Sequence, residues 1–376
     1  MLAVIRTDAA SHIGTGHVMR CLTLAAALRE RGGDAIFVCR ELDRHLCDLI
    51  EARGFTVSRL PAIEVAVDVG ETPAHAGWLC SSWQDDAAQT LAAMHAIDVR
   101  ADWLLVDHYA LDFRWERKLR DAVGRIMVID DLADRVHDCD LLIDQNLVAH
   151  MHTRYEGKVP ADCALLLGPR YALLQPMYSE IHDRIAPRSG PVRRILVFFG
   201  GVDNANLTAR VLAALLGLDR PDIEVDVVMS KSSPHIREVG ILIGRHNNIH
   251  LHWDLPSLAS LMEEADLAVG AGGATSWERL CLGLPALVVT LSENQKPIAD
   301  ELGQHGLVRW LGHSNEVDDD VLVGALGEIL RQGLDKAWSL RCLAAVDGLG
   351  ASRVCAAMVP APGPSPTTRI AGHGDG

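Results

Sequence analysis

The first half of the chain alternates short apolar runs with segments of helical periodicity. The apolar run at 2–7 is followed by an amphipathic segment at 17–31, in which apolar residues recur at helical spacing. The runs that predict strands in this half lie at residues 2–7, 34–40, 55–60, 102–109, 125–131 and 140–146. Strands that are apolar throughout and separated by helices are typical of a parallel sheet covered on both faces.

The same pattern restarts after residues 184–194, a stretch rich in proline, glycine and arginine that we interpret as a linker. The second half predicts strands at 194–201, 224–230, 248–253, 265–273 and 285–290, and helices at 206–216, 258–265 and 276–282. We therefore expect an α/β protein with two Rossmann-like domains, each built on a parallel sheet, and an interdomain cleft.

The domain boundaries follow from these patterns. We expect an N-terminal domain at 1–185, a C-terminal domain at 194–355, and a disordered tail at 356–376, where proline, glycine and polar residues accumulate. Residues 335–354 have a helical pattern, and we expect them to pack back against the first domain.

Composition narrows the class of ligand. The formal net charge of −15 argues against a nucleic-acid-binding protein with a broad basic surface. It does not exclude a nucleotide as a small ligand, because backbone amides at helix N-termini hold phosphates without net positive charge.

The nine cysteines form no CxxC pair and no Cys/His array at zinc spacing, which favours reduced thiols in a cytoplasmic protein. We expect no signal peptide and no membrane span.

A glycine-rich turn in the second half is a candidate phosphate site. Gly270, Gly272 and Gly273 come directly after a predicted strand and before a helix, where backbone amides can approach a diphosphate. Glu278, one turn into that helix, is placed to accept the hydroxyls of a ribose. A tight turn followed by a solvated glutamate accounts for the same pattern equally well.

Two further turns belong to the same candidate site. Gly200 and Gly201 follow the first strand of the second half and either close over the same phosphates or simply open the domain. Asn294 and Gln295 follow the predicted strand at 285–290 and can read sugar hydroxyl or amide groups. Helix capping by Ser292 and Asn294 is the alternative.

The first loop carries the candidate catalytic group. His17 stands between a turn broken by Gly14 and Gly16 and the first long helix, where open α/β sheets keep their ligands. Asp8, on the same loop, either orients His17, binds a sugar amide, or only forms the turn. A capping or packing histidine without chemical role is the alternative for His17.

Other titratable groups fit structural roles better than metal sites. His250 and His252 alternate on a predicted strand without a third ligand at suitable spacing, so they are expected to face solvent. The acidic residues that end the predicted strands are expected to cap the following helices rather than to bind a metal; they are Asp107, Asp130, Asp131 and Asp144.

Several motifs carry a resemblance to a known family. The block at 270–301 resembles the nucleotide-sugar site of glycosyltransferase-B-type enzymes, particularly the lipid II N-acetylglucosaminyltransferase group. Together with "RTDAASHIGTGHVMRCLTLA", the segments "VDHY", "IDD", "DQN", "LLGPRYALL" and "FFGGVDNAN" closely resemble the hydrolases that act on UDP-2,4-diacetamido-2,4,6-trideoxy-β-L-altropyranose in pseudaminic acid biosynthesis. The likeness extends to about residue 354.

The resemblance implies a two-domain glycosyltransferase-B fold, a UDP-sugar substrate, no cofactor, and hydrolysis without a required metal. His17 matches the family's catalytic base in GxGHxxR, Glu278 its ribose-binding glutamate, and Asn294 a polar residue that faces the sugar. The remaining positions implied to line the substrate are Asp8, Gly14, Gly16, Tyr109, Arg170, Gly200, Gly201, Gly272, Gly273, Ala274, Thr275 and Gln295. The chain departs from compact family members at about 64–96 and in its tail.

Physical chemistry agrees with this role for a histidine. An imidazole is largely neutral at pH 7, so it can take a proton from a water that attacks an anomeric carbon, while UDP leaves with little acid assistance. We expect C–O cleavage with inversion and a small-molecule UDP-sugar as partner, with no nucleic acid, no stable membrane association and no obligatory oligomer. The alternatives are a glycosyltransferase that uses the same donor, and a non-enzymatic nucleotide-sugar-binding module that would tolerate loss of His17.

Overall fold

The computed structural model describes residues 1–62, 73–96, 100–200, 203–231, 233–244 and 246–359. Seven parallel strands of the described chain form the first sheet, in the order β3-β2-β1-β4-β5-β6-β7. The strands are β1 (Leu2–Thr7), β2 (Asp34–Arg40), β3 (Thr56–Leu60), β4 (Trp103–Asp107), β5 (Arg125–Ile129), β6 (Leu141–Asp144) and β7 (Ala164–Leu167). The order reverses between β1 and β4, so ligand-binding loops are expected at their carboxyl ends.

Helices cover both faces of this sheet because successive side chains of its strands are apolar on both sides. Ile5 of β1 packs in one core with Leu24 of α1 (Gly16–Glu30). Its neighbour Val4 packs in the other core with Ala87 of α3 and Trp115 of α4. The other elements of this region are α2 (Cys47–Ala52), α3 (Trp83–His95), α4 (Phe113–Leu119) and the 3-10 turns η1 (Ala76–Leu79), η2 (Arg120–Ala122) and η3 (Pro169–Tyr171).

The second sheet repeats the same construction. Its strands β8 (Arg194–Phe198), β9 (Glu224–Met229), β10 (Ile249–Trp253), β11 (Leu267–Ala271), β12 (Ala286–Thr290) and β13 (Arg309–His313) are parallel, in the order β10-β9-β8-β11-β12-β13. Its helices are α6 (Leu207–Gly217), α7 (Ile236–Ile243), α8 (Ala259–Glu264), α9 (Thr275–Cys281), α10 (Lys296–Gln304), α11 (Asp319–Gln332) and α12 (Lys336–Ala345), with the 3-10 turn η4 (Glu293–Gln295). The expected α/β class with two parallel sheets is confirmed.

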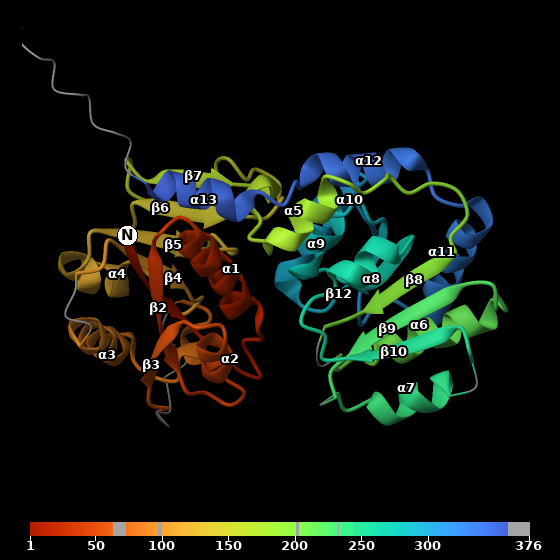
Figure 1. Ribbon diagram of the computed structural model, residues 1–376, viewed down its shortest axis with the longest axis horizontal. Coiled ribbons are helices and arrows are strands. Elements are labelled where there is room, and N and C mark those ends of the chain that lie inside the picture. The colour runs from red at the N-terminus through yellow and green to blue at the C-terminus, as the bar shows by residue number, and fades with distance from the viewer. Residues whose placement is uncertain (63–72, 97–99, 201–202, 232, 245, 360–376) are drawn as a thin grey trace, which may run out of the picture.

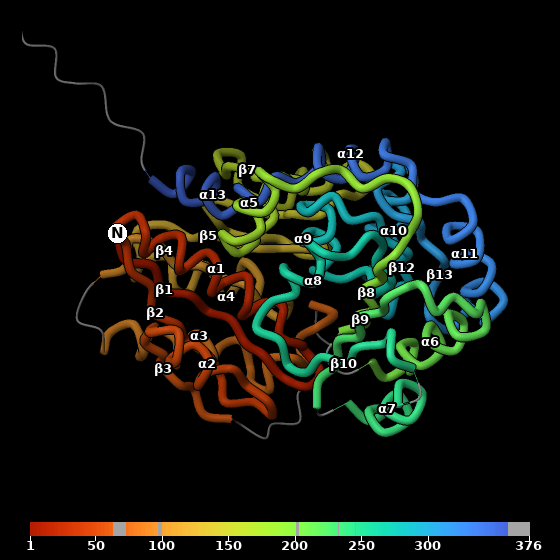
Figure 2. The backbone as a smooth tube through the Cα atoms, turned by 45° about the vertical axis from the view of Figure 1, so that its right-hand side comes forward, coloured from red at the N-terminus to blue at the C-terminus, as the bar shows by residue number. Residues whose placement is uncertain are grey.

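Two helices cross between the halves. Helix α5 (Pro176–His182) follows the first sheet in sequence but packs against α8 and α9 of the second half. Helix α13 (Gly350–Met358) follows the second sheet but packs against α1, and the indole N–H of Trp103 donates to the carbonyl oxygen of Met358 at 3.1 Å. Figures 1 and 2 both show α13, in blue, on the first sheet's side of the molecule.

The expectation for the end of the chain was partly wrong. Residues 335–354 form two helices instead of one: α12 packs against α9 of the second half, and only α13 returns to the first. Helix α13 extends to Met358, beyond the expected start of the tail at 356. The rest of that tail, 360–376, lies outside the described residues.

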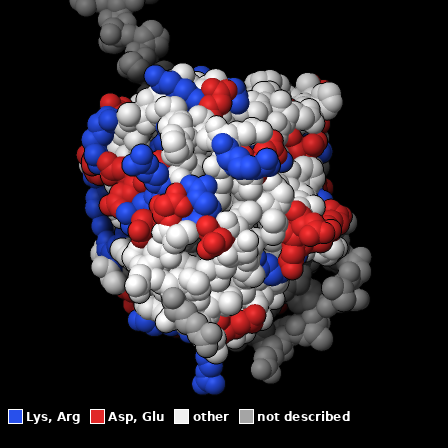
Figure 3. Space-filling view, turned by 90° about the vertical axis from the view of Figure 1, so that its right-hand side faces the viewer, with Lys and Arg blue, Asp and Glu red and all other residues white. Residues whose placement is uncertain are grey.

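One face of the molecule shows how charged side chains are distributed. On the face shown in Figure 3, basic and acidic side chains are interspersed and no continuous basic area is visible. Within the described ranges, every helix is too short or too polar to cross a membrane.

Candidate active site

The first turn of α1 brings His17 to the carboxyl edge of the first sheet. The helix begins at Gly16, directly after the loop that leaves β1, and Gly14 in that loop has a φ of +83° that favours glycine. Asp107 is the last residue of β4, and it pairs with Thr7 at the end of β1. The adjacency of β1 and β4 therefore places the carboxylate of Asp107 beside the start of α1.

His17, Asp107 and Arg20 form a compact hydrogen-bonded group. Nδ1 of His17 donates to Oδ1 of Asp107 at 2.6 Å, since a carboxylate can only accept. Arg20, one turn further along α1, donates to both oxygens of Asp107, each at 2.6 Å. Burial alone would raise the pKa of Asp107, but the charge of Arg20 and the contact with His17 hold it well below its usual range.

This arrangement makes the other imidazole nitrogen a base. With Nδ1 carrying the proton, Nε2 carries the lone pair, and it makes no hydrogen bond to any described residue. The His17 side chain keeps 9% of its surface exposed, whereas Asp107 has none. The group can therefore accept a proton at Nε2, and the Asp107 carboxylate would stabilise the imidazolium that results.

A second carboxylate holds the neighbouring aromatic ring. Asp131, just after β5, accepts from Arg20 at 2.7 Å, from the hydroxyl of Tyr109 at 2.6 Å and from Asn146 at 2.9 Å. Burial and the Asp131 charge raise the pKa of Tyr109 well above its usual value. The Tyr109 ring meets His17 edge-on, with ring centroids 4.6 Å apart. Tyr109 thus lies against His17, and its hydroxyl is already engaged by Asp131.

Asp8 does not orient His17, contrary to one expectation from the loop sequence. It is fully buried, and its two oxygens accept from the Arg6 guanidinium at 2.7 and 2.8 Å and from the backbone N–H of Arg40 at 2.6 Å. His108 Nε2 lies 3.4 Å from it. A carboxylate so enclosed is unavailable to a sugar amide, so Asp8 has a structural role here.

The other acidic strand ends also bind protein groups. Asp130 accepts from the backbone of Ala133 at 2.8 Å, and Asp144 from the backbone of Asn146 at 3.0 Å. The expectation that they cap the following helix was wrong, because the described chain leads from each of them to another strand before the next helix. Both also bind side chains: Asp130 pairs with Arg135 at 3.0 Å, and Asp144 accepts from Arg154 at 2.8 Å. The carboxylates of Asp107 and Asp131 bind side chains as well, which the strand pattern did not indicate. Throughout the described part of the chain, no cluster of three or more His, Cys, Asp or Glu residues is placed to hold a metal ion.

The glycine-rich turn of the second half is built for close packing. A methyl group at Gly270 would lie 2.3 Å from the carbonyl oxygen of Phe198 on the neighbouring strand β8. Arg279 of α9 donates to the carbonyl oxygen of Ala271 at 2.7 Å and to Ser276 at 2.9 Å. The buried guanidinium therefore fixes the path of the turn that carries Gly272, Gly273, Ala274 and Thr275.

Glu278 lies one turn into α9, and α5 supplies its neighbour. Burial raises the pKa of Glu278 to about 7, while the hydroxyl of Tyr178 favours the charged form. Tyr178 belongs to α5, the helix that crosses from the first half. This contact was not predicted from sequence, because it depends on the packing of α5 against α9.

For the other residues expected to line the substrate, the structure shows contacts within the chain itself and backbone conformation. Asn294 accepts from the hydroxyl of Ser292 at 2.6 Å, and Oε1 of Gln295 accepts from the backbone of Leu291 at 2.9 Å, so Gln295 closes its own turn. Arg170 is exposed on η3, and its carbonyl oxygen accepts from Arg353 of α13. Gly200 has a φ of +90°, and Gly201 lies outside the described residues.

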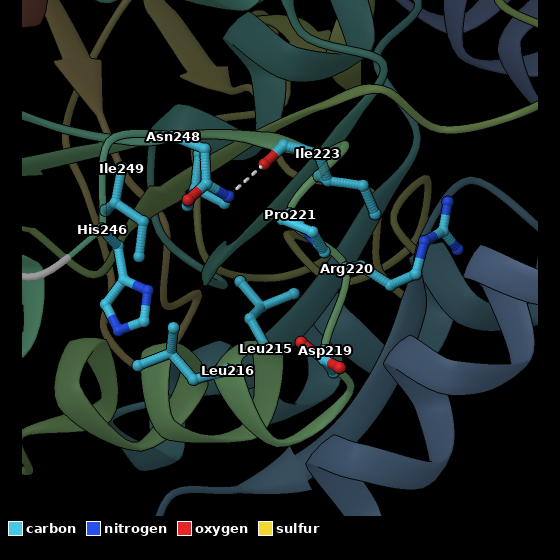
Figure 4. Close-up of a pocket in the computed structure, with 10 residues that line it drawn as sticks. Leu215, Leu216, Asp219, Arg220, Pro221, Ile223, His246, Asn248 and Ile249 are labelled. Atoms are coloured by element: carbon cyan, nitrogen blue, oxygen red, sulfur yellow. Dashed lines mark hydrogen bonds between the residues drawn. The ribbon is translucent and has the colours of Figure 1, made fainter.

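Two histidines and a pocket of the second half lie away from the glycine-rich turn. His250 and His252 bind Glu224 at 2.6 Å and Asp226 at 2.7 Å on the next strand rather than a metal. A pocket lies where β9 and β10 begin, beside the end of α6 (Figure 4), and Ile223, Asn248 and Leu215 are among its lining residues. It is at the amino edge of the sheet, opposite to the edge that carries the glycine-rich turn.

Known structures resemble the whole chain. MurG of Acinetobacter baumannii superposes with a TM-score of 0.65 and 14% identity, covering 95% of this chain and 98% of MurG. The glycosyltransferase of kitacinnamycin gives a TM-score of 0.63 with 16% identity, covering 96% of this chain and 99% of that one. The fold is that of the glycosyltransferase-B enzymes. The expected fold class is thereby confirmed.

Sequence relatives support the expected resemblance. The chain is 25% identical over 308 residues to the UDP-2,4-diacetamido-2,4,6-trideoxy-β-L-altropyranose hydrolase of Campylobacter jejuni, covering 81% of this chain and 97% of that protein. It is 24% identical to an uncharacterized protein of Methanocaldococcus jannaschii, over 80% of this chain and 58% of that protein. It is 33% identical to the spore coat polysaccharide biosynthesis protein SpsG of Bacillus subtilis, over 50% of this chain and 56% of that protein. No family model matches.

Proposed function

We propose that this protein hydrolyses UDP-2,4-diacetamido-2,4,6-trideoxy-β-L-altropyranose to UDP and free 2,4-diacetamido-2,4,6-trideoxy-L-altrose, in a pathway such as pseudaminic acid biosynthesis. The observation that carries the proposal is the hydrogen-bonded pair of His17 and Asp107, which leaves Nε2 unengaged at the carboxyl edge of the first sheet. The similarity to the Campylobacter jejuni hydrolase over nearly its full length supports the choice of substrate.

In the proposed reaction His17 is the general base. Nε2 removes a proton from a water molecule as the water oxygen forms a bond to the anomeric carbon, and the bond between that carbon and the β-phosphate oxygen breaks. UDP departs with the bonding electron pair, and the configuration at the anomeric carbon inverts. Asp107 stabilises the imidazolium formed in this step, while Arg20 keeps the carboxylate ionised and in place.

UDP binding is assigned to the second half. The turn at Gly272, Gly273, Ala274 and Thr275, together with Gly200 and Gly201, is proposed to hold the diphosphate through backbone amides. Glu278 would bind the ribose as a carboxylate. Asn294, Gln295, Tyr109 and Arg170, with the Gly14 and Gly16 loop, are proposed to surround the sugar.

The reaction as proposed uses no metal and no cofactor, because UDP is a good leaving group and its charge can be met by backbone amides. A cytoplasmic location follows from the proposed pathway. Transfer to an acceptor instead of water is the second candidate, favoured by the glycosyltransferases among the structural neighbours.

The test is UDP release by the purified protein from the diacetamido-trideoxy-altrose nucleotide, with EDTA and without any acceptor. UDP-N-acetylglucosamine and stereoisomers of the diacetamido sugar would be assayed beside it. We expect release in the absence of an acceptor, and at least a hundredfold loss in His17→Asn with UDP affinity retained. Release that requires an acceptor would instead support the transferase, and full activity of His17→Asn would refute the assignment of the base.

A further inference from the structure

Three aromatic rings form a wall beside His17, and two of them, His75 and Trp78, come from the described part of the stretch at 64–96. The 3-10 turn η1 carries Trp78, and His75 precedes it. The indole of Trp78 stacks on Tyr109 with ring centroids 5.4 Å apart and 28° between the planes. His75 meets both rings edge-on, at 4.6 Å from Trp78 and 5.4 Å from Tyr109.

This wall faces the proposed base. The Trp78 and His17 ring centroids are 6.5 Å apart, at 80° to one another, and Tyr109 meets His17 at 85°. A group bound at Nε2 of His17 therefore lies within reach of the indole. Trp78 is half-buried, so part of its ring remains available to a ligand.

Two polar atoms of the wall, on Trp78 and on His75, make no hydrogen bond to a described residue. The indoles of Trp103, Trp115 and Trp338 each donate to a protein acceptor. In contrast, Nε1 of Trp78 donates to no described residue. Nδ1 of His75 is buried without a hydrogen-bond partner in the described structure, which is unusual because buried polar atoms in native proteins are nearly always paired.

The wall is also uncharged. Burial lowers the pKa of His75, which favours its neutral form. The Tyr109 hydroxyl stays protonated and bound to Asp131. Arg135, which lies 5.7 Å from the Tyr109 ring, is paired with acidic residues on its own loop. Such a surface suits a neutral substituent better than a carboxylate or a phosphate.

We propose that Trp78, positioned by His75, determines specificity by binding an N-acyl substituent of the sugar. The acyl group offers one apolar methyl and one carbonyl acceptor, which match the face of the indole and its unengaged N–H. The inference rests on the proposed function, because it takes the UDP-linked sugar to lie at His17. It adds Trp78, a residue outside the motifs that carry the resemblance, to the proposed substrate contacts.

Binding measured without turnover tests this directly. In a His17→Asn background, calorimetry would give the dissociation constants of UDP, UDP-glucose and the UDP-diacetamido-trideoxy sugar. We expect Trp78→Phe to weaken binding of the diacetamido nucleotide about tenfold, and Trp78→Ala about 50-fold. The first removes the N–H and one ring of the indole but keeps an aromatic face, whereas the second removes the whole aromatic group. Neither should change the affinity for UDP or UDP-glucose by more than about twofold.

Trp83→Phe is the matched control. Trp83 is also half-buried, packs on the same core as Trp78 and lies under Arg114. Within the described structure, its ring does not contact the rings of His17 or Tyr109. Trp83→Phe should leave all three affinities unchanged. An unchanged affinity of Trp78→Ala for the diacetamido nucleotide would overturn the inference, as would equal weakening of all three ligands.

The outcome is separable from that of the proposed function. If the wild-type protein fails to release UDP but Trp78 still sets the affinity for the acylated sugar, the hydrolase assignment falls and this inference stands. If the His17→Asn protein binds the diacetamido nucleotide no more tightly than it binds UDP, this inference is overturned, whatever the wild-type protein catalyses.

Discussion

Replacement of Asp107 by asparagine tests how the proposed base is activated. The substitution keeps the shape of the side chain but removes the charge that faces both His17 and Arg20. At an effective dielectric constant of about 20, a carboxylate about 4 Å from an imidazolium stabilises it by about 4 kcal/mol, which corresponds to about a 10³-fold rate effect. Arg20 offsets part of that attraction, so we expect kcat for UDP release to fall about 10²- to 10³-fold.

The same substitution has a separate effect on stability. Asp107→Asn leaves Arg20 with Asp131 as its remaining carboxylate, and we expect a loss of about 2–4 kcal/mol in the free energy of unfolding. Because the folded-state pKa of Asp107 is lowered, its contribution is present above the unfolded pKa of about 4 and is lost as the pH falls through the folded value. The part of the stability difference that comes from ionisation of Asp107 itself should therefore be constant above about pH 5 and shrink in more acidic solution.

A matched control separates the two effects. Asp226 is as buried as Asp107, and it binds His252 at 2.7 Å and Arg194 at 2.6 Å. It therefore forms the same combination of aspartate, histidine and arginine, but in the second half and away from His17. Asp226→Asn should destabilise the fold but leave kcat per folded molecule unchanged. UDP release would be followed in a coupled assay, and unfolding by urea titration. A kcat within threefold of wild type for Asp107→Asn, or an equal loss in Asp226→Asn, would refute the reasoning.

Four further predictions rest on other parts of the site. Tyr109→Phe removes a hydrogen bond to the Asp131 carboxylate and should lower the free energy of unfolding by about 1.5–3 kcal/mol in urea titration. UDP affinity should rise from pH 6 to 8, because Glu278 with its pKa of about 7 binds ribose only when ionised; calorimetry should find this dependence flattened in Glu278→Gln. Gly270→Ala places a methyl group against the Phe198 carbonyl and should cost about 3 kcal/mol on unfolding. EDTA should leave the rate of UDP release unchanged, and a loss that zinc or magnesium restores would contradict the metal-free reaction.

Much of the fold could be predicted because the strands are short apolar runs. The expected strands at 2–7 and 34–40 coincide with β1 and β2, and the expected helix at 17–31 differs from α1 by one residue at each end. Strands β7 and β13 were not predicted. Each forms one edge of its sheet. The apolar run of β7, ALLL, is only four residues long, and β13, RWLGH, begins and ends with a polar residue, so neither gives the longer apolar run of the central strands.

The site was less predictable because its contacts join distant parts of the chain. His17 was identifiable from its loop, but its partner is Asp107, 90 positions away, and not Asp8 on the same loop. The order of β1 and β4 creates that contact, and local sequence does not report it. Likewise, Tyr178 reaches Glu278 only because α5 leaves the first half and packs on the second.

The most direct test of the central claim is a reaction in water enriched in ¹⁸O. The diacetamido-trideoxy-altrose nucleotide would be incubated with the protein, and both products analysed early by mass spectrometry. If water attacks the anomeric carbon with His17 as the base, the free sugar carries ¹⁸O and UDP carries none, and His17→Asn forms neither product at a comparable rate. Incorporation of ¹⁸O into UDP would show cleavage at phosphorus and contradict the account.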